Sequence, residues 1–220
     1  MMCHMATRSR ETTSPGVLAI VLFLVPVACM NVGAQERLAP IAEAKMTEAQ
    51  KKAVEEYKLA RPSGPNKFWW LYLRIPEVTI PFLRIQEHVH MNSRLGERLT
   101  HFGILIAAKQ WNQEVVWSLH YDDAIKSGLK VETLKSLAEG RRPEHMAEDE
   151  DLLYDFSIEL QRNQSVSDAT YARALSKFGE EGIADATLIQ GEYTLMSMIM
   201  NLQRTPTAPG WKPLLSHYPR

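Results

Sequence analysis

The sequence is almost free of cysteine, because its two cysteines, Cys3 and Cys29, both lie within the first 34 of 220 residues. It also lacks an excess of either charge, with 25 basic against 26 acidic side chains. A chain so balanced has no electrostatic reason to bind nucleic acid or an anionic membrane. Its 45% hydrophobic and 23% charged side chains are typical of a folded globular protein. We therefore expect a globular protein with no nucleic-acid partner.

An apolar run close to the N-terminus, Val17 to Met30, covers 14 residues and follows two arginines. A helix that spans a bilayer needs roughly 20 residues, so this run predicts no stable membrane insertion. Val32-Gly33-Ala34 then offers the small residues that signal peptidase cleaves after. We interpret residues 1–34 as a secretory signal peptide, which predicts a secreted or periplasmic protein. A retained anchor, or a lipoprotein attached through Cys29, are the alternatives left open.

Cleavage after Ala34 would remove both cysteines and leave a mature chain of 186 residues (220 minus 34). Such a chain can have no disulfide, no thiolate nucleophile and no metal bound by cysteine. It must be stable in an oxidising compartment through its hydrophobic core alone, which its length allows.

The hydrophobic periodicity of the mature chain is helical almost throughout, after a leader at residues 35–46. Thr47-x-x-Gln50 is a capping-box pattern that predicts a helix to about Ala60. Further helices are expected from Pro76 to about Val89, from a cap at Ser93 to about Ile106, from Gln110 to Gly128, and over 131–137, 148–162, 168–178 and 183–202. No stretch alternates with period two between hairpin turns. The sequence therefore predicts an all-α fold, with one domain over residues 47–205.

Two segments have the composition of packing surfaces rather than of sites. The run Phe68 to Leu73 is predicted to fill the core or an oligomer interface, with a wall of a substrate pocket as the alternative. The tail at residues 206–220 is rich in proline, and its Trp211 and Leu214-Leu215 suggest that it docks on a protein surface, of this chain or of a neighbouring subunit.

Three clusters of titratable side chains could carry chemistry. Glu97 and His101 are four residues apart and share a helix face, and Glu114, Trp117 and His120 follow one another at intervals of three. His88 and His90 are two residues apart, so a helix points them in different directions. That spacing does not suit a metal, and we expect no metal site. The chain also lacks a glycine-rich phosphate loop and a Gly-x-Ser-x-Gly elbow.

The order of these motifs resembles the carboxymuconolactone decarboxylase family. The resemblance rests on the run Leu95 to His120, with Ala124, Gly128 and Leu129 after it. Upstream it includes Arg61-Pro62-x-Gly64-Pro65 and Pro76-Glu77, and downstream Val166-Ser167-Asp168 and Gly191-Glu192-Tyr193. It covers about residues 46–205 and is similar to the cysteine-free branch of the family. It implies the all-helical AhpD-like fold and a homo-oligomer, a trimer or a hexamer.

The resemblance also implies a site and a reaction. Glu97 and His120 would be catalytic, a hydrogen-bonded pair that bridges adjacent helices, and Trp117, His101 and Glu114 would contact the substrate. The chemistry would be cofactor-free acid/base work, a decarboxylation or an isomerisation, on a small unsaturated carboxylic acid or lactone. A cation would hold the substrate carboxylate, and the candidates that we considered are Arg74, Arg84 and Arg94.

Departures from the family pattern limit what is expected of this chain. Gln113 and Val116 stand where the peroxidase branch has its two redox cysteines, so we expect no thiol peroxidase activity. The cysteine-free branch usually has a glutamate at the place of Val116 as well. Two alternatives to catalysis follow: Glu97 and His120 form a structural pair, or the protein is a non-catalytic scaffold that binds a small molecule or partners.

Overall fold

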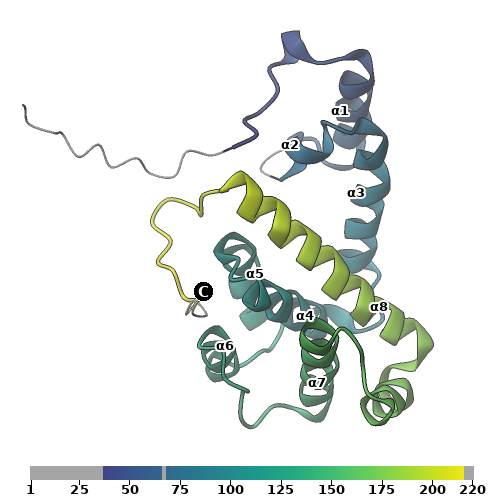
Figure 1. Ribbon diagram of the computed structural model, residues 1–220, viewed down its shortest axis with the longest axis vertical. Coiled ribbons are helices and arrows are strands. Elements are labelled where there is room, and N and C mark those ends of the chain that lie inside the picture. The colour runs from purple at the N-terminus through teal and green to yellow at the C-terminus, as the bar shows by residue number, and fades with distance from the viewer. Residues whose placement is uncertain (1–36, 66–67, 216–220) are drawn as a thin grey trace, which may run out of the picture. The chain divides into compact units, whose positions relative to one another are not determined.

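The computed structural model describes residues 37–65 and 68–215 (Figure 1). The expected signal peptide lies outside the described residues. Within these ranges the chain forms helices and no strand, which confirms the all-α prediction. The elements are a 3-10 helix Glu43–Lys45 and helices α1 (Glu48–Ala60), α2 (Trp69–Tyr72), α3 (Pro76–Met91), α4 (Gly96–Gln110), α5 (Glu114–Lys126), α6 (Val131–Ala138), α7 (Glu148–Asn163) and α8 (Asp168–Gln203).

Local signals in the sequence account for several helix ends. The Thr47 side chain accepts from the Gln50 amide and Gln50 bonds back, so the capping box that begins α1 is confirmed. Gly179 has φ +69 and ψ 178 inside α8, a conformation that glycine adopts readily. It separates the two helices that we predicted at 168–178 and 183–202, which run on as one element with a break.

Helix α4 is the centre of the fold and packs against α5, α7 and α8 (Figure 1). Its buried residues run without interruption from Leu99 to Lys109. Gly103 permits this packing, because a Cβ there would lie 3.1 Å from the Ile189 side chain of α8. The side-chain amide of Gln190, on α8, also donates a hydrogen bond to the backbone oxygen of Gly103 at 2.9 Å. Helices α4, α5 and α8 therefore hold one another at fixed positions.

An aromatic cluster joins α1, α2 and α3. The Trp69 ring lies 4.8 Å from Tyr57 and 5.9 Å from Phe82, and Tyr72 stacks on Phe82 at 4.3 Å. Trp69 is 1% exposed, so the apolar run that begins at Phe68 does fill the core. Phe68 and Trp69 also form part of the wall of a pocket, described below. The run therefore contributes to the core and to a pocket wall.

A buried carboxylate fixes the turn between α3 and α4. Asp185 of α8 bonds the His88 imidazole at 2.7 Å and accepts from the backbone amide of Arg94 at 2.6 Å. We expected Ser93 to cap α4, and this was wrong. The helix begins at Gly96, whose φ of +74 favours glycine, and the Ser93 hydroxyl accepts from the Leu95 amide at 3.3 Å instead of capping the helix.

The C-terminal tail docks on its own chain. The carboxylate of Glu114, on α5, accepts from the Trp211 indole at 2.8 Å and from the backbone amides of Leu214 and Leu215 at 2.7 and 3.2 Å. Leu215 is buried. Across residues 37–65 and 68–215, none of the helices combines the length and the apolar character that crossing a membrane would require.

Candidate functional site

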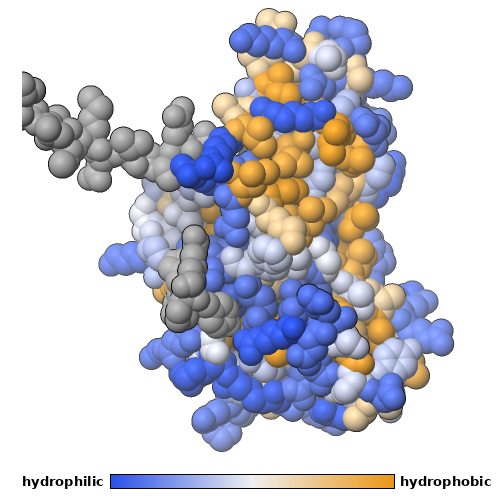
Figure 2. Space-filling view, viewed as in Figure 1, coloured by the Kyte–Doolittle hydropathy of each residue, from blue (hydrophilic) through white to orange (hydrophobic). Residues whose placement is uncertain are grey.

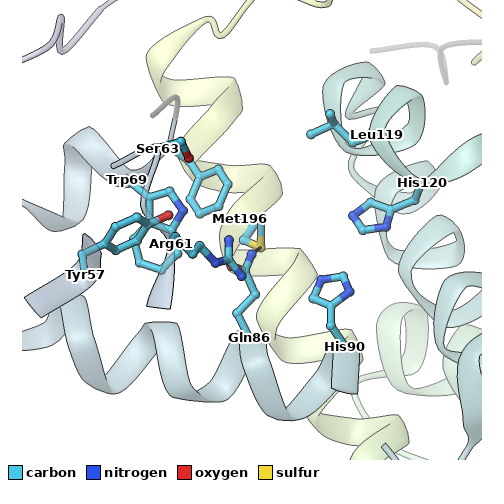
Figure 3. A pocket seen from close by; sticks show the side chains of 10 residues that line it. Tyr57, Arg61, Ser63, Trp69, Gln86, His90, Leu119, His120 and Met196 are labelled. Atoms are coloured by element: carbon cyan, nitrogen blue, oxygen red, sulfur yellow. Dashed lines mark hydrogen bonds between the residues drawn. The ribbon is translucent and has the colours of Figure 1, made fainter. Parts of the chain in front are cut away.

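A pocket of about 480 Å³ opens between the end of α1, α2, α3, α5 and α8 (Figure 3). Aromatic and apolar side chains make up much of its wall, and polar groups face one another across it. The lining residues are Tyr57, Arg61, Ser63, Phe68, Trp69, Gln86, His90, Leu119, His120 and Met196. A mostly apolar cavity with a few convergent polar groups is the usual form of a small-molecule site.

Arg61 supplies the positive charge of the pocket. It follows α1 directly, and its guanidinium lies over the Trp69 ring, 5.8 Å from the ring centroid. In Figure 3 the guanidinium extends past Tyr57 toward Gln86. No carboxylate of residues 37–65 or 68–215 forms an ion pair with it within 4.0 Å. Arg61 is therefore available to an anion.

Two stacked imidazoles form the opposite wall. The rings of His90, on α3, and His120, on α5, are 5.5 Å apart and nearly parallel, with an interplanar angle of 12°. Tyr193 of α8 fixes both, because its hydroxyl bonds His90 Nε2 at 2.7 Å and its ring meets His120 edge-on at 5.2 Å. Burial lowers the pKa of His90 to about 4 and the pKa of His120 well below its ordinary value. Both rings are therefore neutral at pH 7, and burial disfavours their protonated forms.

A third imidazole lies behind this pair. His101 Nδ1 is 3.3 Å from His120 Nδ1, and His101 Nε2 is 4.0 Å from a Glu97 oxygen. Burial also lowers the pKa of His101, although Asp123 and Glu97 act in the opposite direction. His101, Glu97 and Asp123 line a second cavity of about 560 Å³, which shares the wall residues His90, Leu119 and His120 with the first.

The direct Glu97–His120 hydrogen bond that we expected does not occur among the described residues. The Glu97 side chain is 74% exposed, and His101 stands between it and His120. The reason is geometric: Glu97 lies in the first turn of α4, whereas His101 lies one turn further along, where α4 meets α5. His101 therefore lines the second cavity and is the partner of His120.

Trp117 and Glu114 were expected to contact the substrate, and the structure puts them elsewhere. Trp117 is fully buried and lines a separate cavity of about 310 Å³ between α5, α6 and Leu214 of the tail. Glu114 holds the tail, as described above. Trp117 lies three residues before His120 on α5. Its side chain therefore leaves the helix from a different face, which does not line the histidine pocket.

The arginines that we considered for a substrate carboxylate are engaged or exposed elsewhere. Arg74 donates to the backbone oxygens of Trp70 and Ala39, and Arg94 pairs with Glu181. Arg84 is exposed and does not line the pocket. Sequence reasoning missed Arg61, although it is the first residue of the breaker motif that carried part of the resemblance.

Glu192 is a second residue that sequence reasoning missed. It is 4% exposed, and neither carboxyl oxygen has a hydrogen-bond partner among the described residues. Burial raises the pKa of Glu192 to about 8, against the opposing effect of Arg61. The signal that was available is a carboxylate inside the apolar helix 183–202.

The histidines do not form a metal centre in the described part of the chain, where no group of three or more His, Cys, Asp or Glu is arranged to hold a metal ion. Stacked rings such as those of His90 and His120 aim their in-plane lone pairs side by side rather than at one point. His88 and His90 point apart, to Asp185 and Tyr193 respectively. His90, in the last turn of α3, is a residue of the pocket wall.

Comparison with known proteins adds no identification. No protein-family model matches the chain, and no curated protein matches it either.

Proposed function

We propose that the protein is an exported enzyme of the carboxymuconolactone decarboxylase type, with an AhpD-like fold. It would carry out cofactor-free acid/base chemistry, a decarboxylation or an isomerisation, on a small unsaturated carboxylic acid or lactone. The observation that carries this proposal is the pocket in which Arg61 faces the neutral imidazoles of His90 and His120 (Figure 3). The motif order of the sequence supports it independently.

The roles follow from the chemistry of each group. Arg61 would bind the substrate carboxylate, since a guanidinium is a planar donor that matches a carboxylate. His120 would transfer the proton: a neutral imidazole can remove a proton from one carbon and return it to another, which is an isomerisation. After loss of carbon dioxide, the same ring in its protonated form can deliver a proton to carbon. His101 and Glu97 would connect His120 to solvent.

Proton exchange in D₂O tests the proposal directly. The mature protein is incubated with a panel of small β,γ-unsaturated acids and lactone acids, and proton NMR follows deuterium entry at carbon and the appearance of the decarboxylated product. His120→Gln should abolish turnover, because an amide cannot transfer the proton. Arg61→Gln should raise KM, whereas the exposed Arg84→Gln serves as the matched control and should leave KM unchanged. No deuterium entry for any compound of the panel would contradict the proposal.

A non-catalytic scaffold that binds a small molecule is the second candidate. The observation that favours it is the exposure of Glu97, which leaves His120 without a direct carboxylate partner. On that reading an unsaturated acid would bind in the pocket, and the same NMR experiment would show line broadening of the ligand without exchange at carbon.

The proposal includes export and assembly. The exported chain should begin near Gln35 and contain no thiol, which the intact mass of secreted material and a thiol assay check. A product that retains Cys29 with a lipid mass would contradict cleavage after Ala34. Thiol-dependent peroxidase activity is not expected of a chain with Gln113 and Val116 at the dithiol positions.

A further inference from the structure

The carboxyl group of Glu192 is buried without a hydrogen-bond partner among the described residues. Its residue is 4% exposed, and both oxygens lack a hydrogen-bond partner among residues 37–65 and 68–215. An ionised carboxylate in such surroundings costs several kcal/mol, and a group in that position normally becomes neutral instead. Burial and missing partners therefore favour the protonated acid.

The groups that face Glu192 from its neighbours include one cation. Arg61, at the end of α1, attracts the ionised form, and this is the charged group in the described chain that opposes burial. The phenol of Tyr72, on α2, and that of Tyr193, beside it on α8, both have a pKa raised mainly by burial and further by Glu192. From α3 comes the uncharged Gln86, whose amide contacts Met196 one turn after Glu192.

Arg61 thus belongs to two environments at once. It lines the pocket, where it has no carboxylate partner within 4.0 Å in the described chain, and it acts on Glu192 from a distance. A neutral Glu192 leaves the guanidinium charge available to a ligand. An ionised Glu192 neutralises that charge and repels an anion that approaches it.

We propose that Glu192 is held as a neutral acid behind Arg61 and, once ionised, competes with a ligand carboxylate for that guanidinium. Glu192 is thereby a positioning residue that determines whether the pocket accepts anions. The inference rests on the proposed function in one respect, namely that Arg61 is the carboxylate anchor of the pocket.

The pH range of the effect is set by Glu192 and not by its neighbours. Burial raises the pKa of Glu192 to about 8, whereas the pKa of His90 is lowered to about 4 and that of His120 falls well below its ordinary value. Tyr57, which lines the pocket beside Arg61 and interacts with it, has a pKa that burial raises, and the pKa values of Tyr72 and Tyr193 are raised above the ordinary tyrosine value as well. Between about pH 6.5 and 9.5 the group near Arg61 that changes charge is therefore Glu192.

Isothermal titration with crotonate, a small unsaturated carboxylate, tests the inference on the full mature protein. Wild-type affinity should change little from pH 6.5 to 7.5 and be up to about 30-fold weaker at pH 9.5, since one ionisation with a pKa of about 8 changes affinity by at most tenfold per pH unit above that value. Glu192→Gln keeps the shape of the side chain but cannot ionise, so its affinity should stay within about twofold across the range. Glu180→Gln, an exposed glutamate of the same helix, is the matched control and should behave as wild type.

A second measurement keeps the inference testable if Glu192→Gln does not fold. Carboxyl ¹³C NMR of wild-type protein labelled at glutamate Cδ should show one resonance that titrates near pH 8, far above the other glutamates. All glutamates ionised at pH 6 would overturn the inference. The same fall in crotonate affinity in wild type and Glu192→Gln would overturn it while the carboxylate site stands. No saturable binding of crotonate at pH 6.5 would overturn both the carboxylate site at Arg61 and the inference about Glu192. Binding without turnover would count only against the proposed reaction.

Discussion

The Nδ1 atoms of His101 and His120 face each other at 3.3 Å across the junction of α4 and α5. A hydrogen bond between two ring nitrogens requires that one carries the proton and the other accepts it. In the neutral state the two imidazoles must therefore be opposite tautomers. This contact couples the pocket that holds Arg61 to the cavity that holds Glu97 and Asp123, because His120 lines both.

Nitrogen NMR should detect the two tautomers. At pH 7, long-range ¹H–¹⁵N spectra of labelled protein should show one of the pair protonated at Nδ1 and the other at Nε2. His101→Gln should change the pattern of the remaining ring, whereas replacement of the exposed His145 by Asn should not. Two Nε2-protonated rings in the wild type would exclude the hydrogen bond between them.

His90 should make stability fall in acid, because its partly buried imidazole resists protonation. Glu192, whose pKa burial raises to about 8, acts in the opposite direction, so the His90 contribution is taken as the difference between wild type and His90→Gln. The pKa of His90 is lowered to about 4, so between pH 6.5 and 4 the unfolded chain binds a proton that the folded chain does not. The contribution is fully present above pH 6.5 and is lost as pH falls toward 4, by up to about 3 kcal/mol. Urea unfolding at several pH values measures it. His90→Gln should flatten the profile and His145→Asn should not.

The tail depends on Glu114, which accepts three hydrogen bonds from it. Glu114→Gln keeps one acceptor oxygen and removes the charge, so we expect a loss of about 1–2 kcal/mol of unfolding free energy. Hydrogen exchange at the Leu214 and Leu215 amides should become faster. Exchange that is unchanged relative to the exposed control Glu132→Gln would mean that the tail is held by other contacts.

The fold was predictable where the signals are local. The Thr47 capping box, the stop at Gly128 and the break near Gly179 each depend on a few neighbouring residues, and each helix end lies where those residues indicated. The start of α4 was missed because Ser93 competes with Gly96, and tertiary contacts of Asp185 with the turn decide between them.

The site was less predictable because it is built from separate helices. Helical spacing grouped Trp117 and Glu114 with His120, but spacing along one helix says little about which face meets the pocket. Arg61, His90 and Glu192 come from three other elements, and only packing brings them near His120. The resemblance included Arg61 and Glu192 among its motifs but gave neither a role in the site, and it did not include His90.

Assembly should depend on the exposed apolar stripe of α8. Leu195, Met198 and Leu202 are 42, 43 and 50% exposed at helical spacing, and Figure 2 shows apolar surface where Figure 1 places this half of α8. If the protein is a homo-oligomer, Met198→Glu should lower its sedimentation coefficient at micromolar concentration. Leu175→Glu, before the Gly179 break, is the control. Wild-type protein that sediments as a monomer would contradict oligomerisation altogether.

Three substitutions at the paired histidines separate catalysis from structure. His120→Gln retains a polar side chain beside His101 but cannot carry a proton, so turnover should fall on the order of 100-fold or more while the melting temperature changes by a few degrees. His101→Gln should slow turnover less, because His120 still faces the substrate. If the pair is only structural, His120→Ala should instead cost about 1–3 kcal/mol by leaving His101 without its partner, and ligand binding should survive. A melting curve and a ligand titration on each variant therefore distinguish the two roles, and full turnover by His120→Gln would remove His120 from the chemistry.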